Sequence, residues 1–382
     1  MTVPDTRAHD TAVLDPDRIT ELTGGPAGDA RADEALRRLT AALDREARLT
    51  PAGRAVTAES LVAALRTRRQ AEALAAADPG LRESPPRAPL FVTGPLRSGT
   101  TLLHSLLATL PGTRAPKLWE LMAPADPAPD AQLVERARRY VNEYYRAAPA
   151  FRAIHPLAAD EPEECHRLTG TTFADDIYAL RHRVPSYAGW LAGQERRWVF
   201  EQHRLLLNCL LRRGEHDAVP VLKGPSHLWH LDALGAVYPD ARVVRLHRPP
   251  ATALASVCSL TRVVRGARSD QVDPEEIGAY WFDHLATALD ATHPAGEDGV
   301  NGLAVLDVRY SDLIADPVAV VAGIAAFAGL DFGAPQTAAI RSRLAERPQH
   351  RHGVHTYTLE DFGLERPAVD ARFARYTADF GL

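Results

Sequence analysis

Residues 94–101 join a short apolar run to a leucine-rich stretch, and no other segment constrains the fold as strongly. The apolar run, residues 88–92, is typical of a buried strand. Leucines recur at helical spacing after residue 101, which predicts a helix. Two glycines five positions apart, Gly94 and Gly99, let the backbone between them curl so that its N–H groups converge on an anion. The sequence therefore predicts a strand, an anion-binding turn and a helix in direct succession.

Apolar runs and helical stretches alternate along the rest of the chain. Further strands are expected at residues 219–223, 241–246 and 303–308, and further helices at about 131–148, 195–212, 251–260 and 277–291. Another helix is expected to open with Asp316 as its N-cap and Pro317 in its first turn. Strands that alternate with helices predict a central parallel sheet with helices on both faces. We therefore expect an α/β chain with a P-loop-like three-layer fold.

The first 87 residues differ from the rest and are expected to form an N-terminal helical extension. Leu36, Leu39 and Leu43 recur at helical spacing. Proline and glycine at residues 78–80, and two prolines at residues 85–86, then interrupt the pattern. The sequence thus predicts two units, the extension at residues 1–87 and a main domain at residues 88–382. We expect the extension to cover one edge of the main domain; the alternative is that it helps to shape a substrate pocket.

The composition excludes several classes of protein. The 382 residues are 46% hydrophobic and 24% charged, which is typical of a globular chain and excludes global disorder. A net charge of -5 argues against a nucleic-acid binder that relies on bulk electrostatics. The N-terminus does not resemble a signal peptide, and no uncharged apolar run reaches about 18 residues, so we expect no membrane span and a cytoplasmic location. Three scattered cysteines are expected to be reduced core thiols.

The position of the cation in the turn bears on the ligand. Nucleoside-triphosphate loops of the Walker type carry a lysine directly after the second glycine, but this chain has Thr100 there and Arg97 two residues earlier than the glycine. A triphosphate enzyme needs that lysine and Mg²⁺ against the β- and γ-phosphates. The missing lysine argues against a P-loop kinase, which stays open as an alternative function. A non-catalytic nucleotide-binding protein is the other alternative.

A second basic segment offers a separate anion site. Residues 243–249 include the end of a predicted strand and Arg248, and Ser256 follows eight positions later on the next predicted helix. An arginine at the carboxyl end of a strand and a hydroxyl on the following helix can face one anion in the crevice of an α/β sheet. This pair is weak alone, but it gains weight from the anion-binding turn about 150 residues upstream.

The sequence Pro-Leu-Arg-Ser-Gly-Thr-Thr-Leu-Leu at residues 95–103 resembles the 5′-phosphosulfate loop of sulfotransferases that use 3′-phosphoadenosine 5′-phosphosulfate (PAPS). Its Arg-Ser-Gly-Thr-Thr core is similar to that of the bacterial sulfotransferase family and of the tyrosylprotein sulfotransferases. An arginine and a serine spaced eight apart also match the family's 3′-phosphate motif. The resemblance implies that PAPS is the sulfate donor and that it is bound by Arg97, Ser98, Gly99, Thr100, Thr101, Arg248, Ser256 and Tyr310.

Lysine is almost absent from the chain. Of 44 basic residues only Lys117 and Lys223 are lysines, so each deserves a search for a role that arginine cannot fill. Lys223 ends a predicted strand and precedes a Gly-Pro pair. The resemblance implies a catalytic lysine at this position, which stabilises the bridging oxygen while Arg97 shares the charge of the transferred group. We expect Lys117 to be a solvated loop residue.

Sulfuryl transfer to a hydroxyl needs a general base and a positioned cation, and it requires no metal. The resemblance to tyrosylprotein sulfotransferases favours Glu120 as the catalytic base, 23 residues after Arg97. An apolar residue on each side of Glu120 is expected to raise its pKa. His227, four residues after Lys223, is the rival base.

Two further groups of titratable residues are given structural interpretations. Asp160 and Glu163 fit a capping box, so residues 160–164 are expected to begin a helix. His350, His352 and His355 are irregularly spaced, and we do not expect them to bind a metal. The expected acceptor is a hydroxyl, less readily an amine, of a small metabolite or lipid, bound in a pocket of variable loops. The sequence predicts neither the acceptor's identity nor the oligomeric state.

Overall fold

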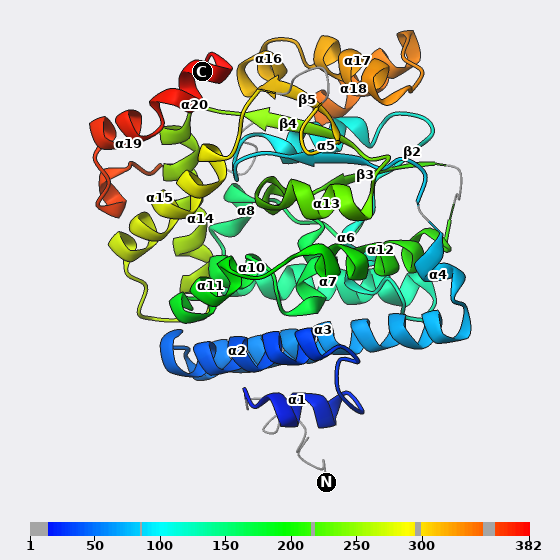
Figure 1. Ribbon diagram of the computed structural model, residues 1–382, viewed down its shortest axis with the longest axis vertical. Helices are drawn as coiled ribbons and strands as arrows, with labels where there is room; N and C mark the ends of the chain where they lie inside the picture. Colours follow the sequence, from blue (N-terminus) through cyan, green and yellow to red (C-terminus); the bar gives the residue numbers. More distant parts are fainter. Residues whose placement is uncertain (1–13, 85, 215–217, 295–298, 347–355) are drawn as a thin grey trace.

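The computed structural model describes residues 14–84, 86–214, 218–294, 299–346 and 356–382. At its centre lies a five-stranded sheet in the order β2-β3-β1-β4-β5 (Figure 1). The strands are β1 (Leu90–Thr93), β2 (Thr113–Arg114), β3 (Val219–Lys223), β4 (Arg242–His247) and β5 (Ala304–Arg309). Every pairing in this sheet is parallel. The predicted α/β fold with a central parallel sheet is confirmed, and only the short edge strand β2 has no counterpart among the predicted strands.

Helices cover both faces of the sheet. Alternate residues of the central strand β1 point to opposite faces, and both sets are buried. Leu90 and Val92 pack in one hydrophobic cluster, whereas Phe91 packs in another. The first face is covered by α5 (Thr100–Leu107), α17 (Pro317–Ala328) and α18 (Ala334–Glu346), and the second by α12 (Arg197–Leu211) and α13 (Leu231–Val237). Burial on both faces explains why β1 is an apolar run.

The remaining helices of the main domain form two groups. Between β2 and α12 the chain forms α6 (Leu118–Met122), α7 (Asp130–Ala147), α8 (Phe151–Ile154), α9 (His166–Thr169), η2 (Gly170–Thr172), α10 (Ile177–Arg181) and α11 (Pro185–Ala192). The rest are η3 (Pro225–His230), α14 (Pro250–Gly266), α15 (Pro274–Asp290), α16 (Tyr310–Ala315), η4 (Glu360–Phe362), α19 (Arg366–Arg372) and α20 (Ala374–Phe380). As predicted, Asp316 caps α17 by accepting a hydrogen bond from the backbone N–H of Ala319.

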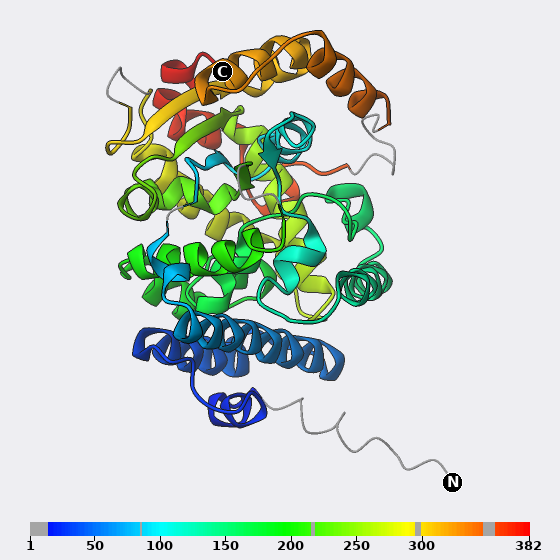
Figure 2. The same ribbon diagram turned by 90° about the vertical axis from the view of Figure 1, so that its right-hand side faces the viewer.

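Between residues 14 and 84 the chain forms four helices: α1 (Pro16–Leu22), α2 (Ala30–Glu46), α3 (Pro51–Ala77) and α4 (Gly80–Glu83). The two long ones, α2 and α3, run side by side beneath the helical layer that contains α10, α11 and α12 (Figures 1 and 2). The predicted leucines of α2 are buried in one cluster with Phe173, Tyr187 and Trp198 of that layer, and Ile177 packs against the same cluster. The extension therefore covers a layer of helices, and a boundary at residue 87 stays a prediction.

Helix α3 approaches the main domain closely at two points. The backbone N–H of Thr50 donates a hydrogen bond of 3.0 Å to the carbonyl oxygen of Arg268. A Cβ atom on Gly53 would lie 2.0 Å from the same oxygen, so only glycine allows this approach. One turn further on, Oγ1 of Thr57 lies 3.1 Å from Nε2 of His182, the residue that follows α10. Helix α3 is thus fixed against the segments that end α10 and α14.

The sequence predicted reduced cysteines and no membrane-spanning helix, and the structure bears on both. Cys165, Cys209 and Cys258 are buried free thiols, as predicted. Within the described residues, none of the helices combines the length and the apolar character that crossing a bilayer demands.

Candidate active site

The turn between β1 and α5 has the conformation that its glycines predict. Gly94, Arg97 and Gly99 adopt φ angles of 143°, 71° and 96°. A Cβ atom on Gly94 would lie 2.4 Å from the carbonyl oxygen of Leu246, and one on Gly99 would lie 2.6 Å from the ring of Tyr310. The backbone therefore curls tightly between β4 and Tyr310, and side chains at these two positions would block it.

The turn also presents unused donors to a ligand. Oγ of Ser98 is fully buried and has no partner among the described residues. Helix α5 begins at Thr100, and no side chain caps its N-terminus. Free N–H groups at a helix N-terminus carry partial positive charge. The turn is thus chemically suited to a phosphate or sulfate group.

The two predicted anion sites meet in the structure. Nε of Arg97 donates a hydrogen bond of 3.1 Å to Oγ of Ser256, and a guanidinium N–H of Arg248 donates one of 2.6 Å to the carbonyl oxygen of Arg97. The hydroxyl of Tyr357 also donates to Oγ of Ser256, at 2.8 Å. Burial lowers the pKa of Arg97. Residues from the turn and from helix α14 therefore form one basic centre.

Tyr310, from the segment after β5, also belongs to this centre. It lies directly after β5, where the chain enters α16. Its ring lies against Gly99 and 4.4 Å from the guanidinium carbon of Arg248. The predicted binding residues Arg97, Ser98, Gly99, Thr100, Thr101, Arg248, Ser256 and Tyr310 thus gather beyond the carboxyl ends of β1, β4 and β5. This is the edge at which α/β sheets bind their ligands.

Lys223 ends β3 beside this centre and is completely buried. Its Nζ atom donates hydrogen bonds of 3.2 Å to Oγ1 of Thr101 and 2.6 Å to Oε1 of Glu164. Burial favours a raised pKa for Glu164, but the charge of Lys223 and a hydrogen bond from His166 hold that pKa well below its ordinary value. The ammonium group is therefore oriented between the turn and a carboxylate, rather than extended into solvent.

The structure corrects the interpretation of residues 160–164 as a helix cap. Helix α9 begins only at His166, so Asp160 and Glu163 do not cap it. Asp160 forms an ion pair with Arg138 at the surface. Glu163 and Glu164 instead face the interior, where Glu164 contacts Lys223. Asp160 and Glu163 have the spacing of a helix cap. Nothing in the sequence indicates that Glu164 contacts Lys223, which is 59 positions away.

His155 and Glu163 form a pair that no sequence pattern indicated. Both line the same cavity as the turn. Nε2 of His155 lies 3.3 Å from Oε2 of Glu163, so the imidazole carries a proton on Nε2 and donates it to the carboxylate. Burial favours a raised pKa for Glu163, but the charge and hydrogen bond of His155 lower it far below the ordinary value. A carboxylate that orients an imidazole is the arrangement of a general base.

The two bases predicted from the sequence lie elsewhere. Glu120 accepts hydrogen bonds of 2.8 Å from Arg114 at one oxygen and 2.8 Å from the backbone of Lys117 at the other, at the start of α6. His227 is buried beside Phe91, and burial lowers its pKa well below the ordinary value. Neither residue is among those that line the cavity. Their catalytic role stays a prediction that the geometry does not favour.

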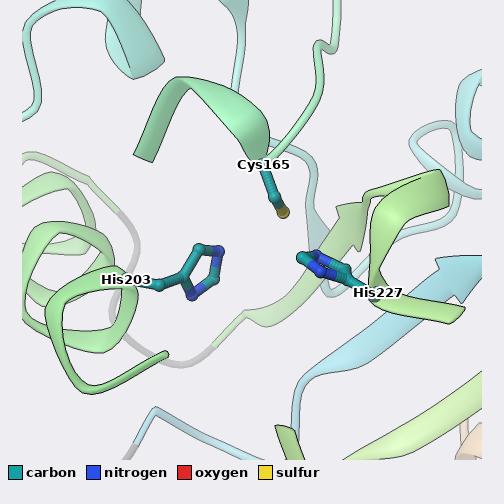
Figure 3. Close-up of side chains that lie close together, drawn as sticks. All are labelled: Cys165, His203 and His227. Atoms are coloured by element: carbon teal, nitrogen blue, oxygen red, sulfur yellow. The ribbon is translucent and has the colours of Figure 1, made fainter. Parts of the chain in front are cut away.

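Figure 3 shows His227 in a different group, with Cys165 and His203. Their sulfur and nitrogen atoms lie within 4.8 Å of one another, and Nε2 of each histidine lacks a partner among the described residues. One thiol and two imidazoles are a donor set that suits Zn²⁺. This group is not part of the cavity lining. The predicted non-ligands His350, His352 and His355 lie outside the described residues.

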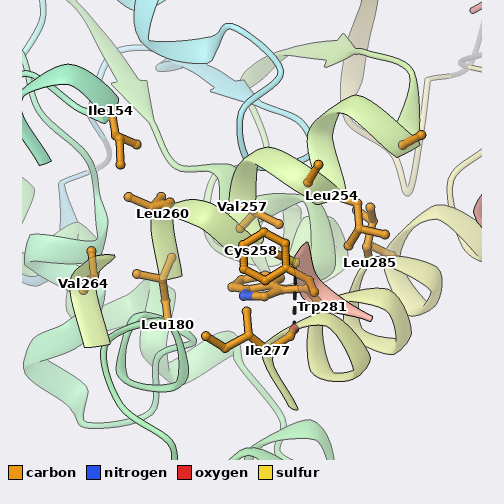
Figure 4. Packing of buried hydrophobic residues seen from close by; sticks show 14 of the residues in the cluster. Ile154, Leu180, Leu254, Val257, Cys258, Leu260, Val264, Ile277, Trp281 and Leu285 are labelled. Carbon is orange, nitrogen blue, oxygen red and sulfur yellow. Dashed lines mark hydrogen bonds between the residues drawn. The ribbon is translucent and has the colours of Figure 1, made fainter. Parts of the chain in front are cut away.

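The cavity has a volume of about 570 Å³ and two chemically different parts. Near the turn it is lined by Arg97, Thr100, Thr101, Arg248 and Tyr310. Further away the walls are mainly apolar and aromatic, and they include Tyr140, Tyr144, Phe151, Ile154, Ile177, Leu180, Leu260 and Val264. Figure 4 shows four of these, Ile154, Leu180, Leu260 and Val264, which come from α8, α10 and α14.

Comparisons with known proteins identify the family of this chain. A sequence model of the sulfotransferase family matches residues 89–334. Sulfotransferase STF1 from Mycobacterium tuberculosis is 32% identical, with a TM-score of 0.80 over 96% of this chain and 99% of that one. Sulfotransferase STF9 from Mycobacterium avium is 25% identical, with a TM-score of 0.83 over 100% of this chain and 99% of that one. The omega-hydroxy-beta-dihydromenaquinone-9 sulfotransferase Stf3 of M. tuberculosis is 24% identical over 77% of this chain and 75% of its own length.

Proposed function

Because the chain belongs to the sulfotransferase family and is an enzyme of sulfuryl transfer, we propose that its donor is PAPS. The turn at residues 94–101 would hold the 5′-phosphosulfate together with Arg97. Arg248 and Ser256 would hold the 3′-phosphate, with Tyr310 beside both groups. When bound, PAPS supplies a sulfuryl group attached to a phosphate leaving group. A P-loop kinase and a non-catalytic nucleotide-binding protein have no observation in their favour.

The hydrogen bond between Arg97 and Ser256 is the observation that carries the donor proposal. A ligand with a single phosphate would need only the turn. The hydroxyl of Ser256 and the guanidinium of Arg248, both in direct contact with Arg97, suit a nucleotide that is phosphorylated at two positions. The orphaned hydroxyl of Ser98 gives the turn a spare donor for the same ligand. Buried polar groups without a protein partner are uncommon unless a ligand or water binds them.

We assign the electrostatic role to Lys223. Its ammonium group is buried, and Glu164 and Thr101 fix its orientation. A preorganised cation in a site that excludes water stabilises charge that develops on a leaving oxygen. Arg97 would share this role at the turn. Glu164 is a positioning residue, because both of its oxygens already accept hydrogen bonds from Lys223 and His166.

The proposed general base is His155 rather than Glu120 or His227. Its Nε2–H is held by Glu163, which leaves Nδ1 to accept the proton of the acceptor hydroxyl. The pair lies close to Lys223, because atoms of His155 and Glu163 lie within 4.8 Å of a carboxylate oxygen of Glu164. The proposed base lines the cavity, and the cation lies directly behind the lining residues Thr101 and Glu164.

The proposed acceptor is the hydroxyl of a small, partly apolar molecule. The cavity offers apolar and aromatic walls beside the proposed base. The relative Stf3 is named for an acceptor that carries an omega-hydroxy group on a menaquinone. A lipophilic molecule with a hydroxyl group would pack its apolar part against the cavity walls and present the hydroxyl to the proposed base.

Calorimetry with 3′,5′-ADP, followed by turnover of labelled PAPS on an extract of hydroxylated metabolites and lipids, tests the proposal. We expect 3′,5′-ADP to bind without Mg²⁺, and a labelled sulfate ester to form in the wild type but not in Lys223→Ala. Binding of ATP with Mg²⁺ and no binding of 3′,5′-ADP would instead indicate a kinase and refute the donor. Binding of 3′,5′-ADP without turnover of any acceptor would favour a non-catalytic protein.

A further inference from the structure

Some of the charged side chains around the cavity form ion pairs, and others do not. Arg343 pairs with Glu161, and Lys223 pairs with Glu164. Arg97 and Arg248 belong to the proposed donor site, where phosphates would neutralise them. Three more arginines line the cavity and form no ion pair within the described residues. Arg152 is exposed to solvent, whereas the other two, on α9 and α10, are half-buried.

Within the described residues, these arginines, Arg167 and Arg181, have neutral hydrogen-bond partners. Arg167 donates a hydrogen bond of 3.1 Å to the hydroxyl of Tyr140 and lies over its ring, while its Nε has no partner in the described part of the chain. Arg181 donates one of 3.1 Å to Nε2 of His166. Burial lowers the pKa of His166 to about 4, so this imidazole is neutral. Its other nitrogen therefore carries the proton donated to Glu164.

Burial lowers the pKa of Arg181, so its charge is costly at this position. Burial acts in the same direction on Arg167, but Tyr140 and the charge of Glu163 outweigh it and raise the pKa of that group. Leu180 and Leu260 line the cavity with them, and an apolar wall solvates charge poorly. The effect reaches Tyr140: burial favours a raised pKa for this phenol, yet the charges of Arg167 and Arg181 outweigh burial and lower the pKa. A buried charge without a counter-ion is destabilising, and a ligand that brings one gains binding energy.

We propose that the acceptor carries an anionic group, a carboxylate or a phosphate, that binds to Arg167 and Arg181 while its hydroxyl is presented to Lys223 and His155. This inference rests on the proposed function and adds the acceptor's charge to it. Three hydrogen bonds, through His166 and Glu164, connect Arg181 to Lys223. The anionic anchor and the transfer site are thus distinct parts of one cavity, and the acceptor is an amphiphile with polar groups at both ends.

Calorimetry with three matched probes tests this, using the full chain saturated with 3′,5′-ADP. The probes are ω-hydroxydecanoate, ω-hydroxydecyl phosphate and the α,ω-diol of decane, which share a hydroxyl and an apolar body. We expect one of the anions to bind at least about tenfold more tightly than the diol, as hydrogen bonds between charged groups allow. The stronger of the two anions identifies the anchoring group as a carboxylate or a phosphate.

Variants then locate the effect. Arg181→Gln and Arg167→Gln should lose the preference for the anion and keep the affinity for the diol, whereas Arg181→Lys should retain part of the preference. Arg152→Gln is the matched control, because Arg152 lines the same cavity but is exposed to solvent, where it lies over the ring of Tyr145. Its loss should leave the preference unchanged, since solvent screens an exposed charge.

The outcomes separate this inference from the proposed function. Equal binding of all three probes to the wild type, or an equal loss in Arg152→Gln and Arg181→Gln, would overturn the anionic anchor while 3′,5′-ADP binding leaves the donor proposal intact. Failure of 3′,5′-ADP to bind would refute the donor. An anion preference measured in the same protein without nucleotide would still support the arginine pair. Retained 3′,5′-ADP binding by each variant shows that it has folded.

Discussion

Nε of Arg97 donates a hydrogen bond to Oγ of Ser256 across 159 residues of sequence. This contact joins the turn after β1 to helix α14 and brings two segments into one candidate binding site. Each segment is built locally, the first by glycines that permit the curl and the second by a strand that runs directly into a helix. The bond brings both to the same edge of the sheet.

Substituting Ser256 tests the two-phosphate interpretation. Ser256→Ala should weaken 3′,5′-ADP binding by about 10- to 100-fold, because a hydrogen bond to a charged group contributes roughly 1.5–3 kcal/mol. Affinity for 5′-AMP, which lacks the 3′-phosphate, should change little. Thr252→Ala is the control, since Thr252 is exposed on the same helix. An equal loss for both nucleotides, measured by calorimetry, would contradict the assignment.

The two lysines of the chain provide a matched pair of variants. Lys223→Ala should lower kcat by about 10²–10³-fold with little change in 3′,5′-ADP affinity, because a preorganised charge acts mainly in the transition state. Lys117 is exposed, so Lys117→Ala should leave kcat unchanged. Lys223→Arg should not restore the rate, because the guanidinium fork does not fit a buried point-charge site. Similar kcat values for the two alanine variants would exclude a catalytic role for Lys223.

Three variants distinguish the possible bases. His155→Asn and Glu163→Gln should each lower kcat, His155→Asn by about 10²–10⁴-fold. Glu120→Gln should keep most of the activity and lower the free energy of unfolding by about 1–3 kcal/mol, because it weakens the buried contact with Arg114. Steady-state kinetics and urea unfolding measure the two effects. The reverse pattern, with activity lost only in Glu120→Gln, would restore Glu120 as the base.

The pairing of Glu164 with Lys223 predicts how stability depends on pH. The pKa of Glu164 is lowered on folding, so the folded protein binds fewer protons than the unfolded chain. The stability that this pairing contributes is therefore present above the unfolded pKa of about 4.3 and is lost as pH falls through the folded value. Glu164→Gln should flatten the acid limb of an unfolding curve measured against pH. A curve unchanged by the substitution would argue against the pairing.

The fold and the arrangement of the proposed donor site were largely predictable because their signals are local. The strand, turn and helix around residues 94–101 are contiguous, so glycine spacing and apolar periodicity indicate them directly. The meeting of Arg97 with Ser256 follows from a general property of parallel sheets, whose carboxyl ends share one edge. The preference for Lys223 came from the scarcity of lysine and from the family resemblance.

The groups beside Lys223 could not be predicted in the same way. Glu163, Glu164 and His155 lie in a segment with little regular structure, and their contacts depend on how it folds over β3. The spacing of Asp160 and Glu163 matched a helix cap, a local pattern that the burial of Glu163 overrides. Glu120 had the expected distance from the turn, yet it lies in the first turn of α6 and bonds to Arg114.

The packing of α2 and α3 beneath α10 has a consequence for how such enzymes diverge. Ile177 packs against the cluster of the N-terminal helices and also lines the cavity, and Thr57 of α3 contacts His182, the neighbour of Arg181. Close-packed interiors transmit changes of volume. A lineage can therefore acquire a new acceptor through mutations in its first eighty residues, while every group that performs the chemistry is inherited intact.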